Sequence, residues 1–262
     1  MMKLGFILLF LLIPWSVTHA KLQTEAIAYS HGDIKLEGHL AWDDSLKGKR
    51  PGIVVVHEWW GLNDYARQRA DQLASLGYVA FALDMYGKGK VTTHPDQASA
   101  WMTEMTANVQ NWQARAMEGL KVLQAQPLVD PHRIAAIGYC FGGGTVTQLA
   151  YSGVSIQGVV SFHGPLPLPD PTQVSGTKAK ILIAHGNADP FLTEGHIGTF
   201  RTALDQAGID WQMIVYAGAR HSFTNPGADQ FGIDALKYNE EADRRSWRHM
   251  QLFFDELFTQ GK

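Results

Sequence analysis

RIAAIGYCFGGG, residues 133–144, is the stretch of sequence that decides the fold. Residues 133–137, apolar after Arg133, predict a buried strand, and the small residues from Gly142 onward predict the start of a helix. Between them, Gly138 and Gly142 flank Cys140 in a Gly-x-Cys-x-Gly turn. Glycines permit a turn so sharp that Cβ atoms on either side would clash, and they leave the central residue strained. A cysteine on such a strand-to-helix turn is a candidate nucleophile.

Cys140 is the only cysteine of the chain. A lone cysteine is commonly a small, buried and inert apolar residue. The flanking glycines favour a reactive role here, because unpaired N–H groups at the start of the helix would stabilise a thiolate or an oxyanion.

Length and charge limit the function classes. The chain has 262 residues and a formal net charge of −3, with no basic block. Nucleic acid is therefore not an expected partner. No linker or repeat divides the sequence after residue 20, so we expect a single α/β domain at 21–262, acting as a monomer.

The first twenty residues have the pattern of a secretion signal. Lys3 precedes an apolar run at 4–13, and small residues at 17–20 offer a cleavage site before Lys21. We expect a signal peptide at 1–20, export to the periplasm or the medium, and no stable membrane association after cleavage. An uncleaved anchor is the alternative, which the shortness of the apolar run disfavours.

Buried strands alternate with helices along the remaining chain. An alternating strand is expected at 34–40, paired with 25–29, and buried strands at 52–57, 78–83, 133–137, 158–162, 180–185 and 211–216. Helices are expected at 64–76, 95–126, 142–151, 193–206 and 234–258. This order predicts an α/β fold with a mostly parallel central sheet and helices on both faces.

An acid and a histidine follow the cysteine, each after a buried strand. Asp189 follows the strand at 180–185, and His221 follows the strand at 211–216. Singly, Asp189 could be a turn residue and His221 a solvated loop residue. Their order after Cys140 is that of the α/β-hydrolase triad. A neutral His221 would take the thiol proton, while Asp189 fixes the tautomer of the ring.

Five motifs together resemble the dienelactone hydrolase family, over nearly the whole chain after residue 20. They are the elbow at 138–143, HGNAD at 185–189, HSF at 221–223, HEWWG at 57–61 and DMYG at 84–87. The resemblance implies an α/β-hydrolase fold and cleavage of small-molecule esters or lactones through a cysteine acyl-enzyme.

The resemblance also implies roles for residues around the nucleophile. Backbone N–H groups of Trp59 and Phe141 would form an oxyanion hole. Glu58 would lie near Cys140, hold the resting thiol protonated, and swing to take the proton when substrate binds. From the residues alone, Glu58 is equally a solvated loop carboxylate.

Two positions depart from the family pattern. Lys88 and Asn225 stand where the family places arginines that hold a substrate carboxylate. Lysine offers a point charge instead of a bidentate fork, and asparagine offers no charge. We therefore expect a neutral ester or lactone as substrate, with Trp59, Trp60 and Tyr86 lining the pocket.

No metal or cofactor is expected, because His57 and Glu58 begin an H-E-x-x-H pattern whose second histidine is missing. A cysteine peptidase or an acyltransferase could use the same residues. A catalytically silent binding protein is the alternative from a different class, and the intact Cys140, Asp189, His221 and Glu58 argue against it.

Overall fold

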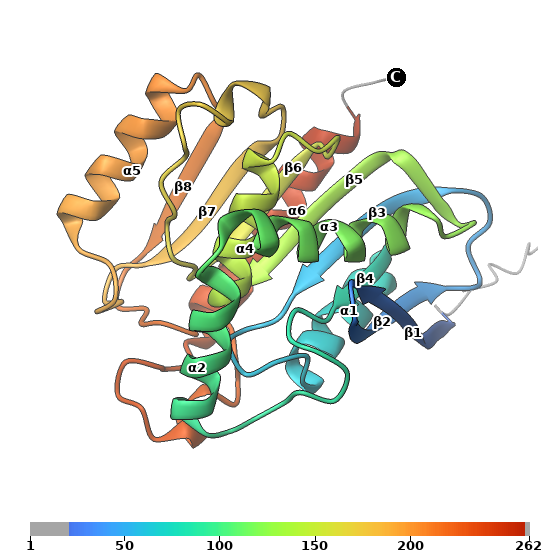
Figure 1. Ribbon diagram of the computed structural model, residues 1–262, viewed down its shortest axis with the longest axis horizontal. Helices are drawn as coiled ribbons and strands as arrows, with labels where there is room; N and C mark the ends of the chain where they lie inside the picture. The colour runs from blue at the N-terminus through green and yellow to red at the C-terminus, as the bar shows by residue number, and fades with distance from the viewer. Residues whose placement is uncertain (1–20, 260–262) are drawn as a thin grey trace, which may run out of the picture.

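The computed structural model describes residues 21–259, which are built around one eight-stranded sheet (Figure 1). The strand order is β1-β2-β4-β3-β5-β6-β7-β8. The strands are β1 (Leu22–His31), β2 (Ile34–Asp43), β3 (Arg50–Val56), β4 (Val79–Leu83), β5 (Val129–Tyr139), β6 (Gly158–Phe162), β7 (Lys180–Gly186) and β8 (Trp211–Tyr216). β1 and β2 pair antiparallel at one edge, and the pairs from β4 to β8 are parallel. The predicted mostly parallel sheet is confirmed.

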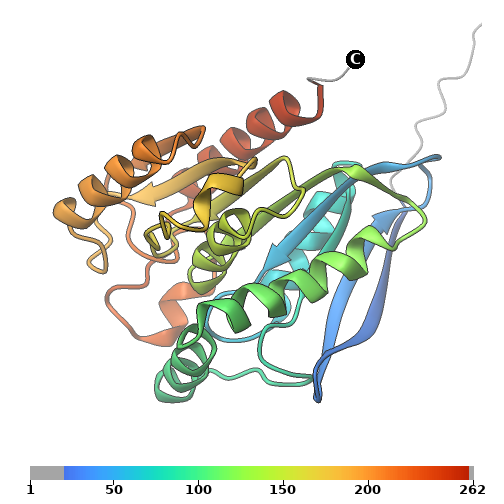
Figure 2. The same cartoon turned by 45° about the horizontal axis from the view of Figure 1, so that its top comes forward.

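Helices cover both faces of the sheet (Figure 2). One face packs against α1 (Asp64–Ser75) and α6 (Glu240–Thr259), the other against α3 (Val109–Gln124), α4 (Phe141–Tyr151) and α5 (Glu194–Gln206). β3 illustrates the reason, because alternate residues of a strand point to opposite faces. Ile53 and Val55 belong to the core under α1 and α6, whereas Val54 and Val56 belong to the core under α3 and α4. A strand buried on both faces must be apolar, as this one is from Pro51 to Val56.

The single helix predicted at 95–126 is wrong, because two helices occupy this stretch. α2 (Pro95–Thr106) ends before Asn108, whose side chain accepts a hydrogen bond from the Asn111 N–H at 2.8 Å and caps α3. A capping side chain satisfies a donor that a helix start leaves open, so it favours a new start there. The periodicity of apolar residues continues through the break and conceals it.

The last helix begins at Glu240 instead of the predicted residue 234. Asn239 caps it by accepting from the Ala242 N–H at 3.0 Å. Before it, a turn at 234–235 leads into an isolated β-bridge between Leu236 and His221, in which the Lys237 N–H donates to the His221 carbonyl at 3.0 Å. Short 3₁₀ helices lie at Val174–Gly176 and Ala228–Phe231.

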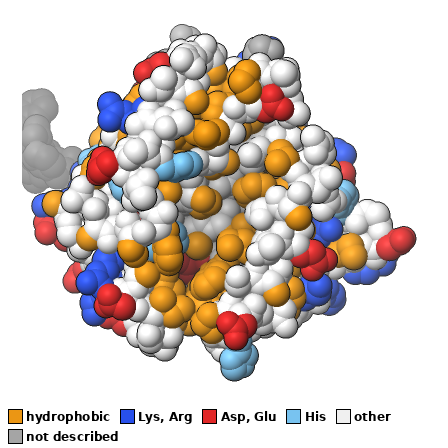
Figure 3. Space-filling view, turned by 60° about the vertical axis from the view of Figure 1, so that its left-hand side comes forward, with side chains coloured by type: hydrophobic (Ala, Val, Ile, Leu, Met, Phe, Trp, Pro, Cys, Tyr) orange, Lys and Arg blue, Asp and Glu red, His pale blue; other side chains and the backbone are white. Residues whose placement is uncertain are grey.

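The carboxyl ends of β3, β5, β7 and β8 lie at one edge of the sheet and carry the predicted site residues. Figure 3 shows the molecule from the side toward which these strands point in Figure 1. Hydrophobic side chains surround a hollow there, and histidine side chains lie beside it. This is the face on which ligands bind in parallel α/β sheets.

The predicted signal peptide at 1–20 lies outside the described residues. Within 21–259, no helix combines the length and the apolar character needed to cross a membrane.

Candidate active site

Cys140 occupies a strained turn between β5 and α4. Its backbone has φ 53° and ψ −121°, a positive φ that non-glycine residues rarely adopt. A Cβ atom on Gly138 would lie 2.0 Å from the Gly142 carbonyl oxygen, and one on Gly142 would lie 2.3 Å from that of Val56. Both positions therefore need glycine, as the sequence predicted. The Cys140 side chain stands at the start of α4, with the residue 9 % exposed.

Asp189 and His221 meet next to this turn. The His221 Nδ1–H donates to Asp189 Oδ2 at 2.7 Å, and the Asp189 side chain is fully buried. The other carboxylate oxygen accepts from the Phe191 N–H at 2.9 Å, which fixes the carboxylate. The Phe191 ring packs edge-on against the imidazole at 4.9 Å. The imidazole is thus oriented, with its second nitrogen left for a different partner.

The surroundings of His221 favour its charged form. Burial alone would lower its pKa, but the Cys140 sulfur and the hydrogen bond to Asp189 outweigh burial and raise the pKa to about 10. The shift favours the doubly protonated ring, and the Cys140 sulfur is its largest favourable partner. The neutral resting His221 expected from the sequence stays a prediction, and the raised pKa points against it.

The two residues expected to form an oxyanion hole both have an open backbone N–H. Phe141 is the first residue of α4, and Trp59 lies in the loop after β3. Within residues 21–259, neither backbone N–H has a hydrogen-bond acceptor. Open donors next to a nucleophile are what an oxyanion hole requires.

Glu58 is fully buried and bonds away from the cysteine. Its carboxylate accepts from the Ser222 hydroxyl and from the Asn225 side-chain amide, each at 2.6 Å. Burial raises the pKa of Glu58, while these two donors and the charge of His221 oppose the rise. The expected contact with Cys140 is therefore absent from this arrangement of the described residues. Asn225, expected to contact substrate, is occupied by Glu58.

The expected pocket residues take different positions. Tyr86 is buried beside Cys140, its hydroxyl has no partner among the described residues, and burial raises its pKa. Trp60, by contrast, is 1 % exposed and stacks on Phe231 at 4.0 Å, so it is a core residue instead of a pocket wall. Lys88 lies at the surface and pairs with Glu37 at 2.6 Å, so its charge is already partnered.

His163 is a site residue that the sequence did not single out. It follows β6 with φ 40°, and its Nδ1 accepts from the Cys140 N–H at 3.2 Å. Its Nε2 therefore carries the proton and donates to the Thr224 hydroxyl at 2.7 Å. Burial and the neighbouring His221 hold the pKa of His163 well below its usual range. The only sequence signal for His163 was its position directly after the predicted strand at 158–162 and directly before Gly164.

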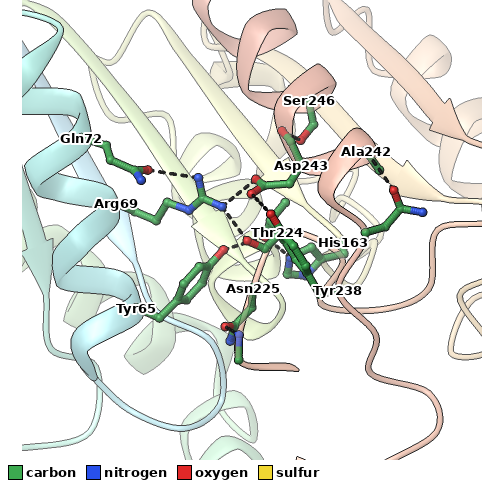
Figure 4. A network of polar contacts seen from close by, with 12 residues as sticks. Tyr65, Arg69, Gln72, His163, Thr224, Asn225, Tyr238, Ala242, Asp243 and Ser246 are labelled. Atoms are coloured by element: carbon green, nitrogen blue, oxygen red, sulfur yellow. Dashed lines mark hydrogen bonds and ion pairs between the residues drawn. The ribbon is translucent and has the colours of Figure 1, made fainter. Parts of the chain in front are cut away.

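Behind His163, a buried arginine ties the histidine loop to two helices (Figure 4). Arg69 of α1 donates to the Thr224 carbonyl at 2.5 Å and to Asp243 of α6 at 2.6 Å. The Tyr65 hydroxyl lies 2.6 Å from that of Thr224. A satisfied buried network of this kind makes its members rigid. It fixes the backbone that carries His221 and Ser222.

No group of three or more His, Cys, Asp or Glu side chains in the described range 21–259 is arranged to hold a metal ion.

Comparison with known proteins identifies a family and several similar structures. The dienelactone hydrolase family matches residues 36–258. A solved structure named m3DLH is 39 % identical, with a TM-score of 0.87 over 90 % of this chain and 98 % of its own. A dienelactone hydrolase-like promiscuous phosphotriesterase from metagenomic libraries is 36 % identical, with the same TM-score and coverage. A relative from Aquifex aeolicus, named as a candidate carboxymethylenebutenolidase, is 28 % identical over 77 % of this chain and 87 % of its own.

The charge of His221 can be measured directly. In a nitrogen-15 NMR titration, we expect His221 to lose its second proton near pH 10 instead of near the ordinary value of 6.5. Replacing the sulfur in Cys140→Ala should lower this midpoint, because the sulfur is the largest favourable partner of the ring. An unchanged midpoint in Cys140→Ala would show that the sulfur does not interact with His221.

Proposed function

This chain belongs to the dienelactone hydrolase family, and on that premise we propose that it cleaves ester or lactone bonds with Cys140 as the nucleophile. One observation carries the proposal. The only cysteine lies on the strained turn after β5, beside an imidazole that Asp189 orients and whose pKa is raised. A protonated imidazole next to a sulfur favours the thiolate, which is the reactive form of cysteine.

In the proposed reaction, the Cys140 sulfur attacks the acyl carbon of the substrate. The carbonyl oxygen becomes an oxyanion, which the Trp59 and Phe141 N–H groups bind. When the intermediate collapses, His221 gives its proton to the leaving oxygen, and a thioester with Cys140 remains. The neutral His221 then takes a proton from water, and the hydroxide attacks the thioester. The acid product leaves, and the thiolate and imidazolium form again.

Glu58 is proposed to accept the thiol proton of Cys140 when substrate binds. Burial raises its pKa, so its carboxyl accepts a proton more readily than an exposed one. Its task is to accept the Cys140 proton in molecules whose sulfur is still a thiol when substrate binds, for which it would have to give up the Ser222 and Asn225 donors. Ser222 has φ 55°, and a loop held in such a strained conformation can favour two arrangements of a neighbouring side chain.

The proposed substrate is a neutral ester or lactone. The two positions that could have offered a cation or an amide to a carboxylate are engaged elsewhere, Lys88 with Glu37 and Asn225 with Glu58. What faces the nucleophile instead is the open Tyr86 hydroxyl, with the 60 % exposed Phe191 beside His221. A neutral phosphotriester is a second candidate class, favoured by the name of the metagenomic relative. The third candidate is a different reaction with the same residues, either cleavage of a peptide or transfer of the acyl group to an acceptor other than water.

We also propose that the mature protein is exported and acts as a monomer free of the membrane. The apolar run and the small-residue site of the first twenty residues support export.

Cys140→Ala should lower ester hydrolysis by at least about a thousandfold, because no other group replaces the sulfur. The measurement is kcat/KM with p-nitrophenyl acetate, and alkylation with iodoacetamide should inactivate the native enzyme to the same extent. Circular dichroism of the variant serves as the folding control. Full activity in a folded Cys140→Ala protein would exclude the mechanism.

Two esters that share a leaving group test substrate charge. The enzyme should prefer p-nitrophenyl butyrate over the p-nitrophenyl monoester of succinate by about tenfold to a hundredfold in kcat/KM, because a missing charge-assisted contact has about that effect. The rates in Cys140→Ala supply the background. Equal or faster cleavage of the anionic ester would mean that a cation, such as Arg220, serves the pocket after all.

Export can be followed by mass. We expect protein recovered from the periplasm or the medium to begin near Lys21, as intact-mass spectrometry would show, and to elute as a monomer in gel filtration. A full-length mass confined to the membrane fraction would favour the uncleaved anchor.

A further inference from the structure

His57 is a fully buried histidine to which the proposed mechanism gives no task. It follows β3 directly and precedes Glu58 and Trp59 in the chain. Both ring nitrogens contact backbone. Nδ1 lies 2.5 Å from the Glu58 carbonyl oxygen, and Nε2 lies 3.2 Å from the Met85 nitrogen.

These two contacts determine where the ring carries its proton. The Met85 N–H can only donate, so Nε2 must be the unprotonated nitrogen. Burial lowers the pKa of His57, although the Glu58 carbonyl and the charge of Asp84 oppose this, so the ring is neutral. Its single proton therefore lies on Nδ1 and is donated to the Glu58 carbonyl oxygen.

The Glu58 carbonyl and the Trp59 N–H are the two ends of one peptide unit. A trans peptide is planar, and its C=O and N–H point in opposite directions. Holding the oxygen therefore sets the direction of the N–H. The Gly61 N–H donates weakly to the same oxygen, at 3.4 Å. Donors on the oxygen also polarise the peptide, which makes its N–H a stronger donor.

We propose that His57 is a positioning residue that aims the Trp59 N–H at the oxyanion. This inference rests on the proposed function, in which that N–H binds the oxyanion. His57 touches no substrate atom and acts through the Glu58–Trp59 peptide.

The far side of the ring is anchored firmly enough for this task. The Asp84–Met85 peptide, whose N–H meets Nε2, is held by the Tyr29 hydroxyl, which donates to the Asp84 carbonyl at 3.0 Å. Arg115 Nη1 holds the next carbonyl, that of Met85, at 3.1 Å. Asp84 accepts from the Tyr86 and Gly87 N–H groups at 2.9 Å each, which fixes the loop after β4. The imidazole thus spans two loops, and the fixed loop holds the one that carries Trp59. A donor held in place before the reaction requires no reorganisation when charge develops.

Two substitutions separate the two contacts of His57. The side-chain amide nitrogen of Asn is the same number of bonds from Cα as Nδ1 of His. His57→Asn therefore keeps a donor for the Glu58 carbonyl but leaves the Met85 N–H without an acceptor. The side-chain amide oxygen of Gln is the same number of bonds from Cα as Nε2 of His. His57→Gln therefore keeps an acceptor for the Met85 N–H but loses the donor to the Glu58 carbonyl. A structural role alone predicts that activity follows stability in both variants.

The readouts are kcat and KM with p-nitrophenyl acetate, the rate of Cys140 alkylation by iodoacetamide, and the thermal midpoint. We expect His57→Gln to lose about tenfold to a hundredfold in kcat with little change in KM, because a displaced oxyanion donor acts on the transition state. Alkylation forms no oxyanion, so its rate should stay within about twofold in both variants. His57→Asn should melt at a lower temperature and yet keep kcat within about threefold of the native value.

Equal losses of kcat in the two variants, or a parallel loss of alkylation, would overturn the proposal. If neither variant folds, nitrogen-15 NMR of the native protein decides, because a proton on Nε2 of His57 instead of Nδ1 would also overturn it. The native enzyme separates this inference from the function itself. If turnover does not depend on Cys140, the proposed function fails. If turnover depends on Cys140 but kcat is the same in His57→Asn and His57→Gln, only the role of His57 fails.

Discussion

The close approach of the backbone on either side of Cys140 is the constraint on which the site depends. Gly138 lies against the Gly142 carbonyl, and Gly142 lies against that of Val56, so close that neither position admits a Cβ atom. The chain can therefore turn from β5 into α4 within a few residues, and Cys140 takes a positive φ. The same turn leaves the Phe141 N–H open beside the sulfur. Strain, nucleophile and one oxyanion donor come from a single piece of backbone geometry.

Strain of this kind persists only where the surroundings hold it, and here polar side chains do so. The non-glycine residues with positive φ in the described chain are Cys140, His163 and Ser222, and all three lie at the site. His163 accepts from the Cys140 N–H, and Ser222 donates to Glu58. The Arg69 network behind them ties the histidine loop to α1 and α6 (Figure 4). A change in α1 or α6 can therefore reach the catalytic loop without touching substrate.

The sequence predicted those parts of the site that follow from local pattern. Cys140, Asp189 and His221 each follow a buried apolar run, and the ends of parallel strands share one edge, so their meeting was predictable. The buried state of Trp60, the partners of Glu58 and the contact of His163 depend on residues far away in the chain. The break before Asn108 was also hidden, because the apolar period continues through it. Local pattern gives strands and turns, whereas the partner of a buried polar group is set by tertiary packing.

The covalent intermediate tests the central claim most directly. Acid-quenched samples of native enzyme mixed with p-nitrophenyl acetate should contain protein that is heavier by one acetyl group. Peptide mapping should place that group on Cys140. Hydroxylamine at neutral pH should remove it from the native enzyme, because a thioester is cleaved under these conditions, whereas an acetyl ester on Ser in Cys140→Ser should persist. An acetyl group on any other side chain, or turnover without a covalent species at any quench time, would contradict the account.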